Sequence, residues 1–444
     1  MKDSYTIFNE NSVKDTELIS DDIDAAEFLR KPENFRPFNL GLLELLKRTL
    51  PECTIKNDAE ASEYLIKALR AIDSDINPKT IRSWFSGEHR PKIEPRSRRA
   101  MYEICFALEL SFADVQWFFH HVYFDRTFNC HNTAEVVFYF AFIHGLNYSE
   151  ASKIIAEVND APEKEIHSEN DGQIYTQLVK NRVLEFDTVD ELKKFLIQNK
   201  SNFHSWNKTA LNYIRKFFGE IIGNEEVSRQ ILQKVKRRIE GKQRNVSDDE
   251  DAEEKLVELN GADVNQFGLL MREILFDARD KNNPCKYRDK EIRNRISGKN
   301  IFSRTFVLDN LLLTFTGFEK KSDIPYVVKN NFPSKKILSD VLDLTKATTS
   351  ESYDAIRKTL ILFNFYIFWC RIKLDGEPLE REDLSEVYTD EITSLLEECG
   401  YEPLYAGNPY DWLFLCSINQ EEPLKFFRST VLGLLEDDLH VILA

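Results

Sequence analysis

The stretch that decides the fold covers residues 77–92 and reads NPKTIRSWFSGEHRPK. Its first residue, Asn77, is a favoured helix cap, and Pro78 suits the first helical position, where a missing N–H costs nothing. Gly87 can adopt the positive φ at which many helices end, and Pro91 prevents the helix from resuming. The sequence therefore predicts a short helix over residues 78–86, followed by a turn.

The predicted helix has two chemically different sides. Ile81, Trp84 and Phe85 lie at i, i+3 and i+4, so they share one side and are predicted to be core residues. The opposite side, here called the polar face, consists of Lys79, Thr80, Arg82 and Ser83. Side chains of these types contact phosphates and base edges in protein–DNA complexes.

A dense group of basic residues follows the predicted helix. The group, here called the basic set, consists of His89, Arg90, Lys92, Arg96, Arg98 and Arg99. Its last members lie near the start of the next predicted helix, where the helix dipole disfavours positive side chains but favours an anion. A bound phosphate would relieve that conflict, so the set indicates contact with a nucleic-acid backbone. The alternative is that each side chain is simply solvated.

This stretch resembles the third helix and following turn of lambda-repressor-like (XRE-type) helix-turn-helix domains, in which the segment reads roughly T-I-x-x-W-x-x-G-x-x-x-P. The matching residues are Thr80, Ile81, Trp84, Gly87 and Pro91. The resemblance covers roughly residues 38–125, under a quarter of the chain. The family usually places an L-A-x-x-x-G turn just before this helix, whereas residues 65–75 read LIKALRAIDSD and contain no glycine.

The resemblance implies a sequence-specific DNA-binding module. The polar face would enter the major groove of double-stranded DNA, and the basic set would hold the phosphate backbone. The family further implies a repressor-like transcriptional regulator that acts as a homodimer. The region beyond residue 175 would then provide dimerisation contacts or bind a protein or peptide effector.

The composition favours an all-α protein with more than one domain. At 444 residues the chain is long enough for two or three domains, and 42% apolar residues suffice for buried cores. Only 15 glycines and 14 prolines occur, which favours long helices over turn-rich β architecture. The formal charge of −16 argues against indiscriminate coating of nucleic acid. It does not argue against a local basic face, because screening limits the reach of charges to about 8–10 Å.

Membrane and secretion signals are not expected in this chain. No run of about 18 apolar residues occurs, and the polar, acidic amino terminus is unlike a signal peptide. The seven cysteines are scattered without CxxC spacing, and Cys105, Cys370 and Cys416 lie in apolar helical stretches. They are typical of reduced core thiols, so the predicted location is the cytoplasm.

Charge and hydropathy patterning divide the chain into consecutive segments. A polar arm with one short helix is predicted over residues 1–36, followed by the helix-turn-helix-containing domain over 37–160. A helical middle region follows over 174–240, then a charged linker over 241–256 and a C-terminal helical domain over 257–444.

The C-terminal domain contains a second stretch of the same kind. Pro333 precedes a short amphipathic segment, and a long apolar helix follows it. A second, degenerate helix-turn-helix over 333–370 is therefore a hypothesis, with Ser334, Lys335 and Lys336 as its candidate DNA contacts. Chance similarity between short amphipathic helices is the alternative.

Motifs of enzyme catalysis are missing from the sequence. None of GxxxxGK[ST], GxGxxG, HExxH, GxSxG or CxxC occurs, so we predict no enzyme activity and no cofactor. The adjacent pair His120 and His121 invites a metal interpretation. Neighbouring helical residues point about 100° apart and cannot easily share one ion. We therefore expect one core histidine and one surface histidine, and no metal site.

Two other classes of function stay open. One is a helical interaction protein of a mobile-element or phage-conflict system, in which the helix-turn-helix is vestigial. The other is a nuclease or toxin whose active site is assembled from residues dispersed along the chain.

Overall fold

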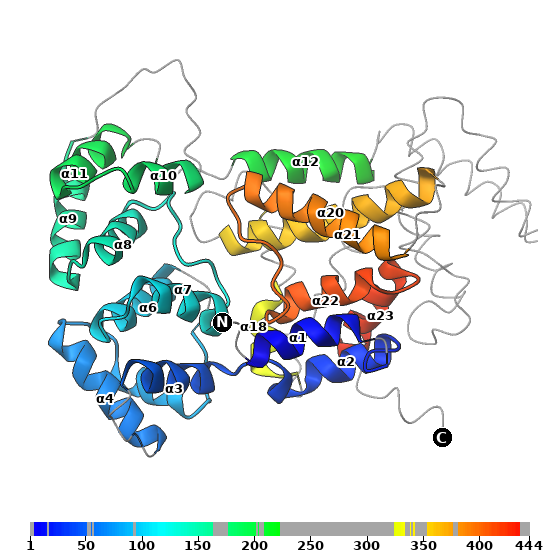
Figure 1. Cartoon of the computed structure of the whole chain (residues 1–444), viewed down its shortest axis with the longest axis horizontal. Helices are drawn as coiled ribbons and strands as arrows, with labels where there is room; N and C mark the ends of the chain where they lie inside the picture. The colour runs from blue at the N-terminus through cyan, green and yellow to red at the C-terminus, as the bar shows by residue number, and fades with distance from the viewer. Residues whose placement is uncertain are drawn as a thin grey trace, which may run out of the picture.

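The computed structural model of the chain is all-α. It describes residues 4–15, 17–50, 55, 57–91, 95–162, 176–200, 203, 208–222, 324–333, 338, 341, 353–375 and 381–435. Within these ranges the regular elements are helices and no strand occurs (Figure 1). The predicted all-α class is confirmed.

The helices surround two apolar cores that lie side by side in Figure 1. The first, here called the α3–α11 core, is built from α3 (Phe38–Thr49), α4 (Asp58–Ala71), α5 (Pro78–Phe85), α6 (Pro95–Ala107), α7 (Phe112–Phe118), α8 (Thr133–His144), α9 (Tyr148–Asp160), α10 (Thr176–Val183) and α11 (Val189–Gln198). A π-helical turn, η2 (Phe119–Tyr123), continues α7 and packs on α3.

The second core, here called the α20–α23 core, draws on both ends of the described chain. Its helices are α1 (Ser4–Lys14), α2 (Asp22–Arg30), α12 (Lys208–Ile222), α18 (Tyr326–Asn331), α20 (Tyr353–Asp375), α21 (Arg381–Glu398), α22 (Pro409–Ile418) and α23 (Pro423–Leu435). A short 3₁₀ turn, η1 (Pro32–Asn34), follows α2. The centre of this core is α20, in which residues 358–370 are all buried.

The amino-terminal segment differs from the expected polar arm. It forms two helices rather than one, with α1 packed on α22 and α2 packed along α23. The Phe28 ring stacks on Trp412 with 4.6 Å between ring centroids, and the Trp412 indole donates a hydrogen bond to the Ser12 hydroxyl. The segment is polar in composition, yet Val13, Ile19, Phe28, Leu29 and Phe35 are buried because the C-terminal helices offer them an apolar surface.

The predicted middle region, 174–240, is shared between the two cores. Helices α10 and α11 bury Val179 and Leu192 in the α3–α11 core, whereas α12 packs along α20. Hydrophobic periodicity predicts that these segments are helical but carries no information about which core each one joins. Residues 223–323, which include the predicted charged linker, lie outside the described residues.

The described cysteines agree with their predicted role as core thiols. Those in the described ranges, Cys105, Cys130, Cys370, Cys399 and Cys416, are all buried. Burial raises the pKa of the Cys130 thiol to about 12, which keeps it protonated and unreactive near neutral pH. None of the described helices is both long and apolar enough to cross a bilayer.

Candidate nucleic-acid interface

The candidate interface is built on α5, which packs against both α3 and α4. As predicted, its apolar side is anchored in the core: Ile81, Trp84 and Phe85 are each at most 5% exposed. The Trp84 ring meets Phe38 of α3 edge-on, with 5.9 Å between centroids. This anchoring fixes which side of α5 faces solvent.

Both ends of α5 are fixed by the residues that the sequence singles out. The Asn77 side chain accepts a hydrogen bond from the Lys79 backbone N–H at 2.9 Å. At the other end Gly87 has φ +77°, and the His89 backbone N–H donates to the Ser83 carbonyl at 3.2 Å. A side chain at Gly87 would be strained at this φ, so the turn depends on glycine.

The polar face is accessible in large part. Lys79, Thr80 and Arg82 are exposed, whereas Ser83 is half-buried and its hydroxyl donates to the Thr80 carbonyl at 2.7 Å. Arg82 has an acidic partner that its sequence context does not reveal: its Nη2 lies 2.7 Å from Glu63 Oε1 of α4. Because both side chains are more than half exposed, the ion pair is worth little and can exchange partners.

The exposed members of the basic set lie around α5 and the start of α6. They are His89, Arg96 and Arg99, and Lys92 lies outside the described residues. Arg99 donates hydrogen bonds to the Tyr148 hydroxyl and to Glu103, and these contacts raise its pKa. Arg99 is thus a positioned cation that still has an exposed guanidinium, since 69% of its side chain is accessible.

Two members of the basic set are buried, which corrects their predicted role as phosphate clamps. Arg90 is 5% exposed, donates to the Tyr123 carbonyl at 2.7 Å and lies over the Phe124 ring. Arg98 is 8% exposed and points into the protein. Neither side chain can reach a phosphate in this arrangement, because both are almost fully buried.

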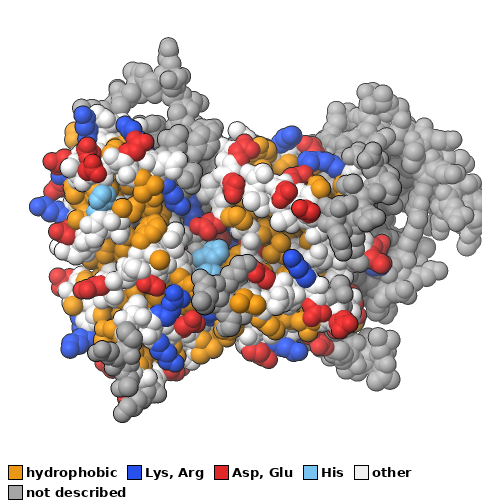
Figure 2. All heavy atoms as spheres, viewed as in Figure 1, with side chains coloured by type: hydrophobic (Ala, Val, Ile, Leu, Met, Phe, Trp, Pro, Cys, Tyr) orange, Lys and Arg blue, Asp and Glu red, His pale blue; other side chains and the backbone are white. Residues whose placement is uncertain are grey.

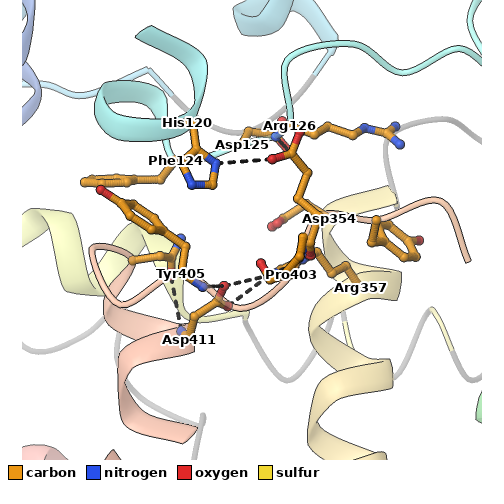
Figure 3. Close-up of a pocket in the computed structure, with 12 residues that line it drawn as sticks. His120, Phe124, Asp125, Arg126, Asp354, Arg357, Pro403, Tyr405 and Asp411 are labelled. Atoms are coloured by element: carbon orange, nitrogen blue, oxygen red, sulfur yellow. Dashed lines mark hydrogen bonds and ion pairs between the residues drawn. The ribbon is translucent and has the colours of Figure 1, made fainter. Parts of the chain in front are cut away.

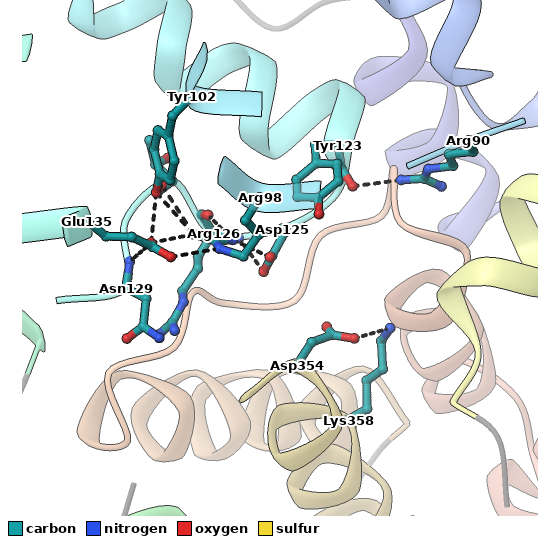
Figure 4. Close-up of polar contacts among 11 residues, drawn as sticks. Arg90, Arg98, Tyr102, Tyr123, Asp125, Arg126, Asn129, Glu135, Asp354 and Lys358 are labelled. Carbon is teal, nitrogen blue, oxygen red and sulfur yellow. Dashed lines mark hydrogen bonds and ion pairs between the residues drawn. The ribbon is translucent and has the colours of Figure 1, made fainter. Parts of the chain in front are cut away.

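Arg98 is instead the centre of a buried polar network (Figure 4). It forms a bidentate ion pair with Glu135, with N–O distances of 3.0 and 2.7 Å, and a second ion pair with Asp125. The Tyr102 hydroxyl lies 2.8 Å from the Glu135 carboxylate, and the Asn129 backbone N–H donates a hydrogen bond to the same carboxylate. The network ties α6 to the 125–135 segment.

Burial and charge act in opposite directions on the pKa values of this network. Burial by itself lowers the pKa of Arg98, but the carboxylates of Asp125 and Glu135 outweigh it and raise the pKa well above its usual range. Burial by itself raises the pKa of Glu135, yet the charge and hydrogen bonds of Arg98 lower it overall. The Arg98–Glu135 pair therefore stays ionised.

The sequence does not reveal the carboxylates that engage these arginines. Glu63, Asp125 and Glu135 are 19, 27 and 37 positions away from their arginine partners. No local spacing rule links residues so far apart, so only the folded chain identifies the pairs. The one local signal is the i,i+4 spacing of Arg99 and Glu103, which favours an ion pair on a helix.

The second candidate interface, predicted at residues 334–336, is not covered by the described residues. Ser334, Lys335 and Lys336 lie outside the described residues, as does most of the connection to α20. The long apolar helix predicted after them is present as α20.

The charge on the described surface is mixed. Figure 2 shows Lys and Arg side chains interspersed with Asp and Glu over α3 and α4. Over residues 37–110 the sequence holds 12 Lys or Arg against 11 Asp or Glu, so this region is close to neutral overall.

Comparison of the chain with protein-family models, with characterised proteins and with solved structures finds no match.

Proposed function

We propose that the protein is a sequence-specific DNA-binding regulator that reads the major groove with α5. The observation that supports this is the fixed exposure of the polar face: one side of α5 is anchored in the core, both ends are capped, and Lys79, Thr80 and Arg82 face solvent. Arg and Lys are the usual bidentate partners of guanine, and Thr contacts several bases.

The proposed phosphate contacts are revised by burial. Arg90 and Arg98 are withdrawn, and His89, Arg96 and Arg99 are the described members of the basic set that remain as candidate phosphate contacts. The near-neutral charge over residues 37–110 implies weak non-specific affinity, because that affinity comes from phosphate neutralisation. Binding would then depend on base contacts from the polar face. A repressor-like reader acts on two half-sites, so we propose a homodimer as the active form.

The test is selection of bound fragments from a random double-stranded DNA pool with the full chain, followed by affinity measurement on the enriched site. We expect Arg82→Ala to relax base preference at one position and lower affinity about 10-fold or more. Lys216→Ala is the matched control, since Lys216 is an exposed cation on α12 in the other core. It should leave affinity unchanged.

A second candidate, a helical protein-interaction component, is favoured by one observation. The near-neutral charge over residues 37–110 is unusual for a surface that must approach DNA. If the wild-type chain enriches no site at about 50 mM salt, where phosphate contacts are strongest, the DNA-reading proposal is wrong. The polar face should then be tested as a protein contact.

A further inference from the structure

A pocket lies where the α3–α11 core meets the α20–α23 core (Figure 3). It contains about 440 Å³ of atom-free space, part of which is open to solvent. One wall comes from η2 and the residues that follow it, and the other from the start of α20 and the 401–411 segment. Figure 2 shows histidine and acidic side chains together at the hollow between the two cores.

The histidine pair forms part of this junction, which corrects the expectation of one core and one surface histidine. Both are half-buried. His121 Nδ1 lies 2.6 Å from the Tyr405 hydroxyl, and His120 Nδ1 lies 3.3 Å from Glu402 Oε2. The His120 ring also packs on Tyr405, with 4.2 Å between centroids. The pair therefore docks one core on the other.

The side chains that line the pocket include more carboxylates than cations. The lining carboxylates are Asp125, Asp354, Glu402 and Asp411, and the lining guanidinium groups are those of Arg126 and Arg357. Cations outside the lining act on three of these carboxylates: Arg98 on Asp125, Lys358 on Asp354 and Lys180 on Glu402. Within the lining, Glu402 is paired with His120, which carries charge only when protonated.

The cations of the pocket are already engaged or turned away. Arg357 forms a bidentate pair with Asp411, at 2.9 and 2.7 Å, and also donates to the Pro403 carbonyl. In Figure 3 the Arg126 guanidinium points away from His120 and Tyr405. The pocket therefore offers carboxylates, rather than cations, to a ligand placed beside Tyr405.

The surroundings of Asp354 disfavour its ionised form. Its carboxylate lies 2.6 Å from Lys358 Nζ. Burial has the largest effect on the pKa of Asp354 and raises it, and the charge of Asp125 raises it further. The charge of Lys358 lowers this pKa but does not offset the other two effects, so the pKa lies above its usual value. One more positive charge in the pocket would stabilise the ionised form of Asp354.

Aromatic rings complete the pocket wall. Phe124 and Tyr405 lie next to His120 in Figure 3, and Tyr401 also borders the pocket. Aromatic faces attract a cation by about 0.5–2 kcal/mol, depending on how far it is desolvated. Carboxylates beside aromatic rings are the combination that recognises organic cations. The described residues include no group of three side chains suited to a metal ion.

We propose that this pocket binds a small organic cation with a primary ammonium or guanidinium group, held between Tyr405 and the carboxylates of Asp354 and Glu402. This proposal does not rest on DNA binding by α5, and it is tested without DNA.

The test is isothermal titration calorimetry of the full chain with agmatine and cadaverine as probes. 4-Guanidinobutanoate, which carries a carboxylate in place of the ammonium group, is the ligand control. We expect agmatine or cadaverine to bind with a dissociation constant of about 1 mM or below, and the carboxylate analogue to bind at least about 10-fold more weakly.

Variants locate the site. Glu402→Gln and Asp354→Asn should each weaken binding about 10-fold, because each removes a carboxylate without changing side-chain volume. Tyr405→Phe should keep affinity within about threefold, because it keeps the ring. Glu397→Gln, an exposed acid on α21 away from the pocket, is the matched control and should have no effect. Glu402 is 38% exposed, so Glu402→Gln keeps the test valid even if Asp354→Asn destabilises the fold.

Two outcomes would overturn the proposal. One is that neither amine binds at concentrations up to about 10 mM. The other is that binding occurs but is unchanged by Glu402→Gln, which would place the amine elsewhere on this acidic chain.

Discussion

Arg96 and Arg98 lie two positions apart at the start of α6, and their environments are opposite. Arg96 is exposed, whereas Arg98 is buried with Glu135 and Asp125 as ion-pair partners. In the sequence both belong to one basic run, and both carry the same expectation of phosphate contact. Residues two apart on a helix point about 200° apart, so one of them faces the core when the other faces solvent.

This difference predicts opposite effects on stability. Arg98→Ala leaves two buried carboxylates without their main partner, so it should lower the free energy of unfolding by about 3–5 kcal/mol. Arg96→Ala should change it by less than about 0.5 kcal/mol. Urea unfolding followed by circular dichroism measures both. Equal effects of the two substitutions would contradict the buried network.

At the scale of elements, the contact between α4 and α5 controls Arg82. Glu63 of α4 competes with DNA for the Arg82 guanidinium. Glu63→Gln should raise affinity for the selected site by about two- to fivefold, which corresponds to the worth of an exposed ion pair. Unfolding stability should stay within about 0.5 kcal/mol for the same reason.

The control for this prediction is Glu60→Gln, which removes a charge from the same turn of α4 but not the partner of Arg82. Fluorescence anisotropy with labelled DNA measures both variants. A similar gain in both would mean that reduced long-range repulsion, rather than release of Arg82, is responsible.

A second prediction at this scale concerns two helical glycines. A Cβ at Gly41 would lie 2.5 and 2.8 Å from the Val122 methyl groups of η2, whereas a Cβ at Gly219 of α12 meets nothing within 4 Å. Gly41→Ala should therefore cost about 1–3 kcal/mol through overpacking of α3 against η2. Gly219→Ala should stabilise by up to about 1 kcal/mol through helix propensity.

Thermal unfolding compares these two glycine variants directly. Both place alanine in a helix, so propensity favours both and only the tertiary contact separates them. Stabilisation by Gly41→Ala would show that α3 and η2 are not in close contact.

At the scale of the whole molecule, the two cores interleave along the chain. The first two helices join the last two, and the chain between them builds the α3–α11 core before α12 returns to α20. The two cores meet where η2 contacts the 401–411 segment. The hydrogen bond between His121 and Tyr405 lies at this junction.

This topology predicts where a core mutation acts. Phe28→Ala removes the ring that stacks on Trp412 and should destabilise the α20–α23 core by about 3–5 kcal/mol. Hydrogen exchange should therefore speed up in α22 and α23 and stay unchanged in α4 and α8. Ile23→Ala, an exposed position on the same helix, is the control. Faster exchange throughout both cores would mean that they unfold as one unit.

The sequence by itself determined the all-helical class, the limits and buried side of α5, and the buried cysteines. These features depend on caps, glycine conformation and helical periodicity, which act within a few residues. The tertiary structure alone decided that α1 and α2 pack with the C-terminal helices, that Arg98 is structural and Arg96 exposed, and that the histidine pair docks one core on the other. Their partners lie tens to hundreds of positions away, and burial of apolar surface, which is not directional, selects such partners only in the folded chain.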